Sequence, residues 1–321
     1  MPPKAGRACF AGMESFTANG VPLERWKVGA ATYETCLTRG ARLLRWDLDI
    51  PGGRRQILHW PAEGSLDLDK IGHVRGGNPI LFPFMGRNYC DGEKFAWRAS
   101  DGVKRPMPQH GFARDTEFKI VEHSAKHAVV ELVPNAHTQA CYPFHYRFRI
   151  RFDFLELFLR ITFELTNEDH QNIPWCAGHH FYFTLPWHAG LQRRDYRVKI
   201  PSKKQWRHAA DGKLVPFADF KGTTEINFDN PALSDCIFTN LKASTVQFGP
   251  KSGEEDITVK VGEEAIPGPW ATIVTWTSDP EAAFYCIEPW MGPPNSPEHK
   301  NGLHFVEPGK SDTFVTEVSL M

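Results

Sequence analysis

Hydrophobic and polar residues alternate with a period of two through residues 144–166. In the first half of this segment the apolar positions are Phe144, Tyr146, Phe148, Ile150, Phe152 and Phe154. In the second half they are Leu155, Leu157, Leu159, Ile161, Phe163 and Leu165. Such alternation indicates a strand with one buried face, and a one-residue change of phase would turn that face over within a single strand. We therefore predict two antiparallel strands joined by a tight turn near residues 153–156.

The first of these strands carries a row of basic residues at its polar positions. They are Arg147, Arg149 and Arg151. Because they alternate with the apolar positions, they belong to the face that points away from the core. We predict that this row is a solvated face rather than a binding site.

Other short segments have the composition of strands and are bounded by glycine, proline or polar residues. They are residues 30–37, 41–48, 56–60, 196–200, 233–238, 272–276, 284–290 and 312–320. The first two are separated by Thr38-Arg39-Gly40, which predicts a hairpin. No long amphipathic helix, fixed repeat or linker-like change of composition interrupts them. The pattern predicts an all-β sandwich or barrel-like fold, formed by residues 1–321 as a single domain.

Composition narrows the class of protein. The 321 residues include 37 Lys and Arg against 38 Asp and Glu, a formal net charge of −1. This balance argues against a nucleic-acid-binding protein, which would have a basic excess. The 10 Trp and 23 Phe suit both a large β core and the apolar faces of sugars.

Targeting signals and cysteines bear on the compartment. We find no signal-peptide pattern and no apolar run near the ~20 residues that a membrane helix needs. The seven cysteines are scattered, odd in number and without a CxxC pair. A reduced, cytoplasmic protein with no membrane or nucleic-acid partner is therefore expected, as a monomer or weak homodimer.

Residues 106–115, with the sequence PMPQHGFARD, concentrate side chains that can do chemistry. His110 can change charge near neutral pH, Gly111 allows backbone angles that other residues avoid, and Arg114 offers a planar fork of donors. The segment predicts a positioned histidine on a tight bend. The alternative is an ordinary proline-rich turn with an exposed histidine.

Residues 75–87 form a second unusual stretch, with Arg75 and Arg87 at its ends. Pro79 and Pro83 argue against a helix and against a central strand, so an irregular extended segment is expected. Its glycines match neither GxGxxG nor GxxxxGK[ST], which excludes the common phosphate loops.

Two further spots carry titratable groups among aromatic residues. His179 and His180 follow Gly178, and in a strand they would point to opposite sides, so only one of them can share a pocket with His110. Glu288 lies inside an aromatic and apolar run, where a carboxyl group is costly to bury unless it is paired or protonated.

Taken together, these segments resemble the aldose 1-epimerase (mutarotase) family. The matching sequences are GGNPILFP at 76–83 with GR at 86–87, MPQHGFAR at 107–114, GHHFYF at 178–183 and CIEPW at 286–290. They are ordered and spaced as in that family and span most of the chain, and their combination is specific. The resemblance implies a large antiparallel β-sandwich, of the galactose mutarotase-like supersandwich type. It also implies an isomerase that interconverts the α and β anomers of free sugars without a cofactor.

The same resemblance implies roles for individual residues. His180 takes the catalytic position, His110 is its partner and Glu288 is the base. Arg87 binds substrate, and by a looser match Asp235 binds sugar hydroxyl groups. The family's usual proline after the catalytic histidine is Phe181 here, which changes the local packing.

The hypothesis is therefore a cofactor-free hexose mutarotase acting on a small-molecule sugar. Glu288 would take the proton of the anomeric hydroxyl while His180 gives a proton to the ring oxygen. His110 and Arg87 would hold sugar oxygens, and Trp290 would stack on sugar C–H faces.

Three alternatives remain open. Arg75, Arg87 and Arg114 would suit a phosphate, as in a hexose-6-phosphate mutarotase on the same fold. A non-catalytic carbohydrate-binding sandwich would keep the pocket without the reaction. A metal site of His110, His180 and Glu288 fits by ligand type, but no HxH or HExxH spacing supports it, so no metal is expected.

Overall fold

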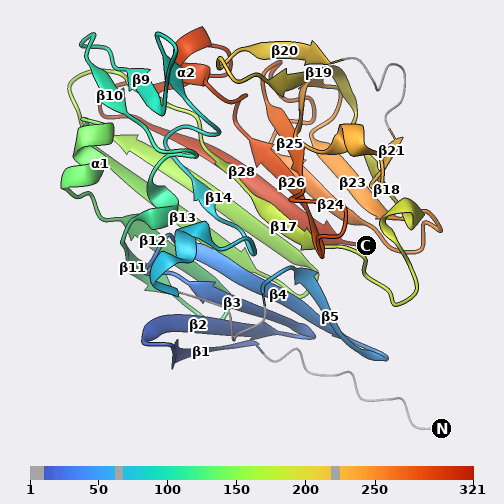
Figure 1. Cartoon of the computed structure of the whole chain (residues 1–321). Helices are drawn as coiled ribbons and strands as arrows, with labels where there is room; N and C mark the ends of the chain where they lie inside the picture. Colours follow the sequence, from blue (N-terminus) through green and yellow to red (C-terminus); the bar gives the residue numbers. More distant parts are fainter. Residues whose placement is uncertain (1–10, 62–67, 218–224) are drawn as a thin grey trace, which may run out of the picture.

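The computed structural model describes residues 11–61, 68–217 and 225–321, and two large antiparallel β-sheets dominate these residues (Figure 1). The main path of the larger sheet runs through β1 (Ala11–Ala18), β2 (Val21–Val28), β3 (Ala31–Cys36), β4 (Arg42–Ile50), β5 (Gly53–Leu58), β17 (Phe181–Thr184), β26 (Phe284–Trp290), β25 (Thr272–Trp276), β22 (Cys236–Leu241), β19 (Ser202–His208) and β20 (Leu214–Phe217). Beside this path, β16 (Gly178–His179) pairs with β26 and with β6 (Ile80–Leu81). Strands from both ends of the chain therefore share one sheet.

The second sheet consists of β11 (Phe118–His123), β12 (His127–Leu132), β13 (Tyr146–Phe154), β14 (Phe158–Asn167), β28 (Ser311–Leu320), β24 (Ile257–Val261), β23 (Thr245–Pro250), β18 (Tyr196–Lys199) and β21 (Glu225–Asn227), in that order. Three short pairs are β7 (Tyr89–Cys90) with β8 (Glu93–Lys94), β9 (Ala96–Arg98) with β10 (Lys104–Pro106), and β15 (Ile173–Trp175) with β27 (His304–Val306). The predicted all-β class is confirmed.

Helices are few and short in the described ranges. The α-helices are α1 (Ala136–Cys141) and α2 (Ser296–His299), and the 3-10 turns are η2 (Leu68–His73), η3 (Ala113–Asp115), η4 (Arg193–Asp195) and η5 (Pro231–Leu233). None of the helices so described has the length and apolar character needed to cross a bilayer.

Aromatic side chains from the two sheets pack against each other and form the core. Trp26 of β2 stacks on Phe154 of β13, with ring centroids 4.6 Å apart. Phe183 of β17 meets Phe248 of β23 edge to face at 4.9 Å. Because each pair joins one sheet to the other, the fold is a sandwich, as the sequence predicts.

The alternating segment 144–166 forms the paired strands β13 and β14, in register from Tyr146 opposite Asn167 to Phe154 opposite Leu159. The turn lies slightly later than predicted. Leu155 and Leu157 belong to this turn and are 45% and 47% exposed, so they are not part of the buried face. The Tyr33 hydroxyl donates to the Leu155 carbonyl oxygen at 2.6 Å and fixes the turn to the other sheet.

The predicted solvated face of β13 is confirmed. Its three arginines are half-buried and pair with acidic side chains on the outside of the sheet: Arg147 with Glu168, Arg149 with Glu131 and Arg151 with Asp153. The six cysteines within the described ranges are buried and free of disulfides, and Cys9 lies outside those ranges.

Candidate active site

A cavity of about 430 Å³ lies against strands β22, β25 and β26 of the larger sheet. Every residue predicted for the site lines it: Arg75, Arg87, His110, His180, Asp235, Glu288 and Trp290. These residues come from segments more than 200 positions apart in the chain, so the sandwich brings together what the sequence separates. Arg114, the third arginine of the phosphate alternative, also lines the cavity.

His110 lies on the bend that the sequence predicts. Its φ is +67° and that of Gly111 is +75°, the left-handed region that most residues avoid. A Cβ atom at Gly111 would lie 1.9 Å from the Phe82 carbonyl oxygen, so only glycine fits there. His110 is buried, which excludes the alternative of an ordinary turn with an exposed histidine.

Backbone contacts also fix the tautomer of the His110 ring. The backbone N–H of Gly86 donates to Nδ1 of His110 at 3.2 Å. Burial lowers the pKa of His110 well below its ordinary value, with smaller contributions from His180 and Arg114. The neutral ring therefore carries its hydrogen on Nε2, which lies 3.3 Å from the Gln109 side-chain amide.

The paired histidines point to opposite sides, as predicted. His179 is in the core, between Phe163 at 4.4 Å and Phe181 at 5.1 Å between ring centroids. His180 faces the cavity, where its ring is 5.4 Å from that of His110 and stacks on Tyr182 at 4.7 Å. Only His180 thus shares a pocket with His110.

His180 and Glu288 form a buried acid–base pair, with 3.5 Å between Nε2 and Oε1. Burial lowers the pKa of His180 to about 3, and the positive charge of Arg114 adds to this effect. Burial raises the pKa of Glu288 well above its ordinary value, and the nearby Asp235 carboxylate adds to it. The proton of the pair therefore resides on Glu288, and both groups are uncharged.

Asp235 lies in the turn before β22 with a φ of +55°. Burial raises the pKa of its carboxyl group, and the charges of Arg207 and Arg87 oppose that shift. Trp290 donates its indole N–H to the His179 carbonyl oxygen at 3.0 Å. Its ring therefore keeps a fixed orientation at the cavity wall, 5.8 Å from the ring of His110.

Several residues of the cavity have no role in the sequence analysis. Trp276 lies in a predicted core strand, but it lines the cavity and carries the Arg75 guanidinium over its ring at 5.5 Å. His208 of β19 also lines the cavity, although it lies in a polar stretch without a motif. Asn78 does not line the cavity but contacts both histidines of the 179–180 pair, and nothing local in its matched segment indicates this.

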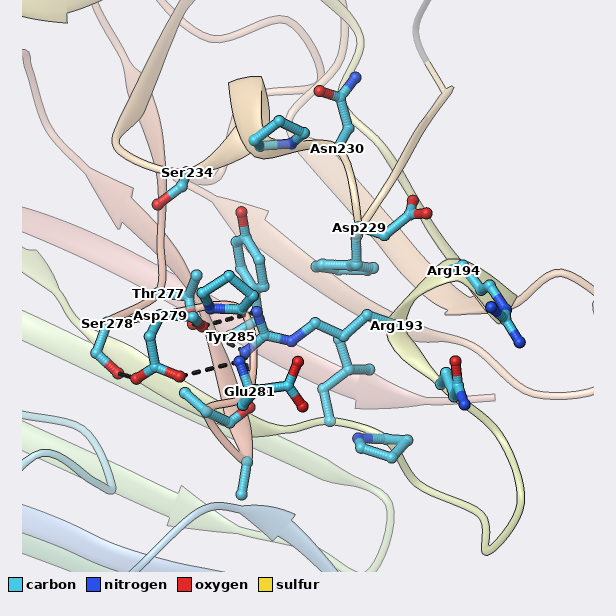
Figure 2. Close-up of a pocket in the computed structure, with 18 of the residues that line it drawn as sticks. Arg193, Arg194, Asp229, Asn230, Ser234, Thr277, Ser278, Asp279, Glu281 and Tyr285 are labelled. Atoms are coloured by element: carbon cyan, nitrogen blue, oxygen red, sulfur yellow. Dashed lines mark hydrogen bonds between the residues drawn. The ribbon is translucent and has the colours of Figure 1, made fainter.

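A larger cavity of about 890 Å³ lies elsewhere, around Arg193 and Tyr285 (Figure 2). The Arg193 guanidinium donates to Thr277 Oγ1 at 3.0 Å and to the Ala282 and Phe284 carbonyl oxygens at 2.6 and 3.0 Å. Its donors thus hold the protein's own backbone, and none of the described lining residues is a histidine. The smaller cavity, with its acid–base pair, is the candidate active site.

Comparisons with known proteins agree with this geometry. The family model described as aldose 1-epimerase matches residues 32–319. The plasmid-encoded LacX protein of Lactococcus lactis subsp. lactis is 23% identical over 243 residues, 71% of this chain and 78% of LacX. A galactose mutarotase-like protein from Clostridium acetobutylicum has the same fold, with a TM-score of 0.77 at 16% identity over 97% of this chain and 98% of that one. The Slr1438 protein from Synechocystis sp. PCC 6803 superposes with a TM-score of 0.73 at 22% identity, over 100% and 99% of the two chains.

Proposed function

The chain belongs to the aldose 1-epimerase family, and on that premise we propose that it interconverts the α and β anomers of a hexose. The observation that carries this proposal is the meeting of Glu288, His180 and His110 in one cavity, with 3.5 Å between the Glu288 carboxylate and the His180 ring. No cofactor enters the proposed reaction, since it needs only two proton transfers.

The Glu288–His180 pair holds one transferable proton throughout the proposed reaction. With the proton on His180, the Glu288 carboxylate removes the hydrogen of the anomeric hydroxyl while His180 protonates the ring oxygen. The C1–O5 bond breaks and the open-chain aldehyde rotates about C1–C2. Reversal of both transfers closes the ring as the other anomer, and the pair recovers its starting state.

Burial favours the state with Glu288 protonated and His180 neutral, which is the arrangement that exists after ring opening. A carboxylate with a raised pKa is also a stronger base than an ordinary one. The pKa directions of the two groups therefore favour proton transfer to Glu288 during ring opening, and ring closure returns a proton to His180.

The other residues would bind the sugar oxygens. His110 offers Nε2–H to a developing negative charge, and Arg87 makes no hydrogen bond or ion pair with another described residue, so its donors are available. Asp235 accepts hydrogen bonds from sugar hydroxyl groups, and Trp290 supplies an apolar face.

Replacement of the base tests the proposal. Glu288→Gln should lower the rate of anomer interconversion by roughly 10²–10⁴-fold, measured by polarimetry on α-D-glucose. Glu24→Gln is the matched control, because Glu24 is also buried with a raised pKa but binds Thr35 and the Leu37 backbone N–H away from the cavity. Wild-type rates in Glu288→Gln would refute the assignment. A wild-type protein that binds sugars without accelerating mutarotation would favour the non-catalytic alternative.

A hexose 6-phosphate is the second candidate substrate. Arg75, Arg87 and Arg114 all line the cavity. Arg114 lies 3.5 Å from Asp115, whereas Arg75 and Arg87 have no carboxylate within ion-pair distance among the described residues. Two arginines without such partners favour an anionic ligand.

Comparison of kcat/KM for glucose, galactose and glucose 6-phosphate decides between the substrates. If the phosphate is recognised, Arg75→Ala should raise KM for glucose 6-phosphate alone. An equal change of KM for all three sugars would argue against a phosphate site.

A further inference from the structure

Cys286 lies directly behind the acid–base pair. Cys286 and Glu288 are two residues apart on β26, so their side chains project from the same face of the sheet. His180 precedes β17, which pairs with β26 through Phe181 opposite Ile287. One ligand atom from each of His180, Cys286 and Glu288 lies within 4.8 Å of the others, and all three residues are buried.

Two polar atoms of this cluster have no hydrogen-bond partner among the described residues: Oε2 of Glu288 and Nδ1 of His180. Glu288 is 1% exposed, and a buried polar atom without a partner is costly. The proposed proton transfer gives no role to Cys286. The cluster thus has unused ligand capacity.

We propose that His180, Cys286 and Glu288 form a binding site for a thiophilic divalent cation such as Zn²⁺, and that the bound cation inhibits the enzyme. An imidazole, a thiolate and a carboxylate are ligands that Zn²⁺ accepts in tetrahedral sites, with the fourth position open to water. Thiolate and carboxylate together balance the charge of the ion, so the buried complex is neutral.

The geometry fits with a small adjustment. Donor atoms of a tetrahedral zinc site lie roughly 3.3–3.8 Å apart, given bonds of about 2.0–2.3 Å. His180 Nε2 and Glu288 Oε1 are already 3.5 Å apart. A separation at the 4.8 Å limit would have to shorten by about 1–1.5 Å for a tetrahedral site. Two of the three ligands, His180 and Glu288, line the cavity, from which a water molecule would fill the fourth position.

In the proposed site the third ligand is Cys286. The sequence alone suggested His110 as a ligand beside His180 and Glu288. Nδ1 of His110 accepts the Gly86 backbone N–H, which holds that ring in its own place.

The imidazole and the carboxylate that would bind the ion are the groups that move protons in the proposed function. Inhibition therefore rests on that function, whereas metal binding does not.

Cobalt(II) is the probe, because thiolate ligation gives an intense sulfur-to-metal charge-transfer band in the near ultraviolet. Titration uses the full chain with Cys9→Ala, so that no thiol outside the described residues contributes. We expect one bound cobalt ion per chain with this band, displaced by added Zn²⁺. Cys286→Ala should lose the band. Its affinity for Zn²⁺ should also fall by more than the roughly 10–100-fold that is lost when a residue supporting a metal ligand is removed.

Cys36→Ala is the matched control, since Cys36 is also a buried free thiol, and it should leave cobalt and zinc binding unchanged. If Cys286→Ala does not fold, as judged by circular dichroism, Cys286→Ser replaces it. A band that persists in the Cys286 variant, or the absence of any band in the parent protein, would overturn the proposal.

Mutarotation assays separate this inference from the proposed function. Zn²⁺ should inhibit the parent enzyme and inhibit the Cys286 variant at least about tenfold more weakly. Cobalt binding without any mutarotase activity would keep the metal site and reject the proposed reaction. Equal inhibition of the parent and the variant would reject the metal site alone.

Discussion

The side-chain amide of Asn78 holds His179, with 2.9 Å between Asn78 Nδ2 and His179 Nδ1. The same amide accepts the backbone N–H of His180 through Oδ1 at 3.1 Å. With Asn78 buried between them, one side chain fixes the first histidine in the core and the peptide that turns the second toward Glu288. The orientation of His180 thus depends on a residue from a segment about 100 positions earlier in the chain, which does not itself line the cavity.

Asn78→Ala should therefore lower kcat for mutarotation more than it changes KM. It should also lower the free energy of unfolding by roughly 1–3 kcal/mol, because His179 Nδ1 and the His180 N–H lose their partner. Urea unfolding and polarimetry measure the two effects. Asn167→Ala is the control: Asn167 is a buried asparagine that binds the Gln171 and Val306 carbonyl oxygens, and its loss should cost stability without changing kcat. Equal kcat values in both variants would show that Asn78 has only a structural role.

Gly111→Ala should be among the most destabilising single substitutions in the chain. A Cβ atom there would meet the Phe82 carbonyl oxygen at 1.9 Å, on a residue with a φ of +75°. Backbone of both segments would have to move, which costs roughly 3 kcal/mol or more. Gly92→Ala is the matched control, since Gly92 has a φ of +80° with nothing within 4 Å of the added atom. Similar losses of melting temperature in the two variants would show that the close approach at Gly111 contributes little.

Arg42 supports the wall of the cavity that carries Arg75. Its buried guanidinium donates to the carbonyl oxygens of Ile71, Val74 and Gly76. Arg42→Met would leave these three carbonyl groups without their donor, so we expect a loss of about 3 kcal/mol in the free energy of unfolding and an increase in KM as the loop moves.

Arg197→Met is the control for this effect. Arg197 is a similarly buried arginine, 2.6 Å from Asp256, but it does not line the cavity. It should lose stability with KM unchanged, and Arg42→Lys should reverse part of the KM increase seen in Arg42→Met. A KM that stays constant in Arg42→Met would remove the positioning role.

Acid should destabilise the fold through its buried histidines. Burial lowers the pKa of His179 and His180 to about 3 and that of His208 to about 4. Unfolded histidines titrate near 6.5, so below that pH the unfolded chain binds protons that the folded chain does not. The stabilisation is therefore complete above pH 6.5 and is lost as the pH falls toward 4 and 3. Glu288 has the opposite sign, since its raised pKa favours the fold at low pH.

Urea unfolding at a series of pH values checks this dependence. Each such histidine should contribute a slope of up to about 1.4 kcal/mol per pH unit below pH 6.5. The slope for His208→Gln should be lower than that of the wild-type protein by the contribution of one histidine, up to about 1.4 kcal/mol per pH unit. Identical slopes for His208→Gln and the wild-type protein would contradict the prediction.

Local patterns were sufficient for much of the fold. The period-two alternation around Phe148 and Phe163 predicts β13 and β14, because burial of one face of a strand is recorded in every second residue. The turn was predicted slightly too early, since Leu155 and Leu157 are apolar but exposed, and hydrophobicity alone does not distinguish a turn leucine from a core leucine.

The sequence by itself pointed to three side chains that line the cavity, because His110, His180 and Glu288 each lie in a segment whose residue types are unusual for a plain strand. The choice of His180 over His179 came from the family resemblance, and Trp276 and His208 were not anticipated. Only the tertiary structure decided how the three side chains meet. The order β5–β17–β26–β25 joins strands from distant parts of the chain, and such long-range pairing leaves no trace in local periodicity. The same is true of Asn78 between the paired histidines and of Cys286 behind Glu288. Their neighbours come from other strands, so their roles arise from contacts that exist only once the sandwich has closed.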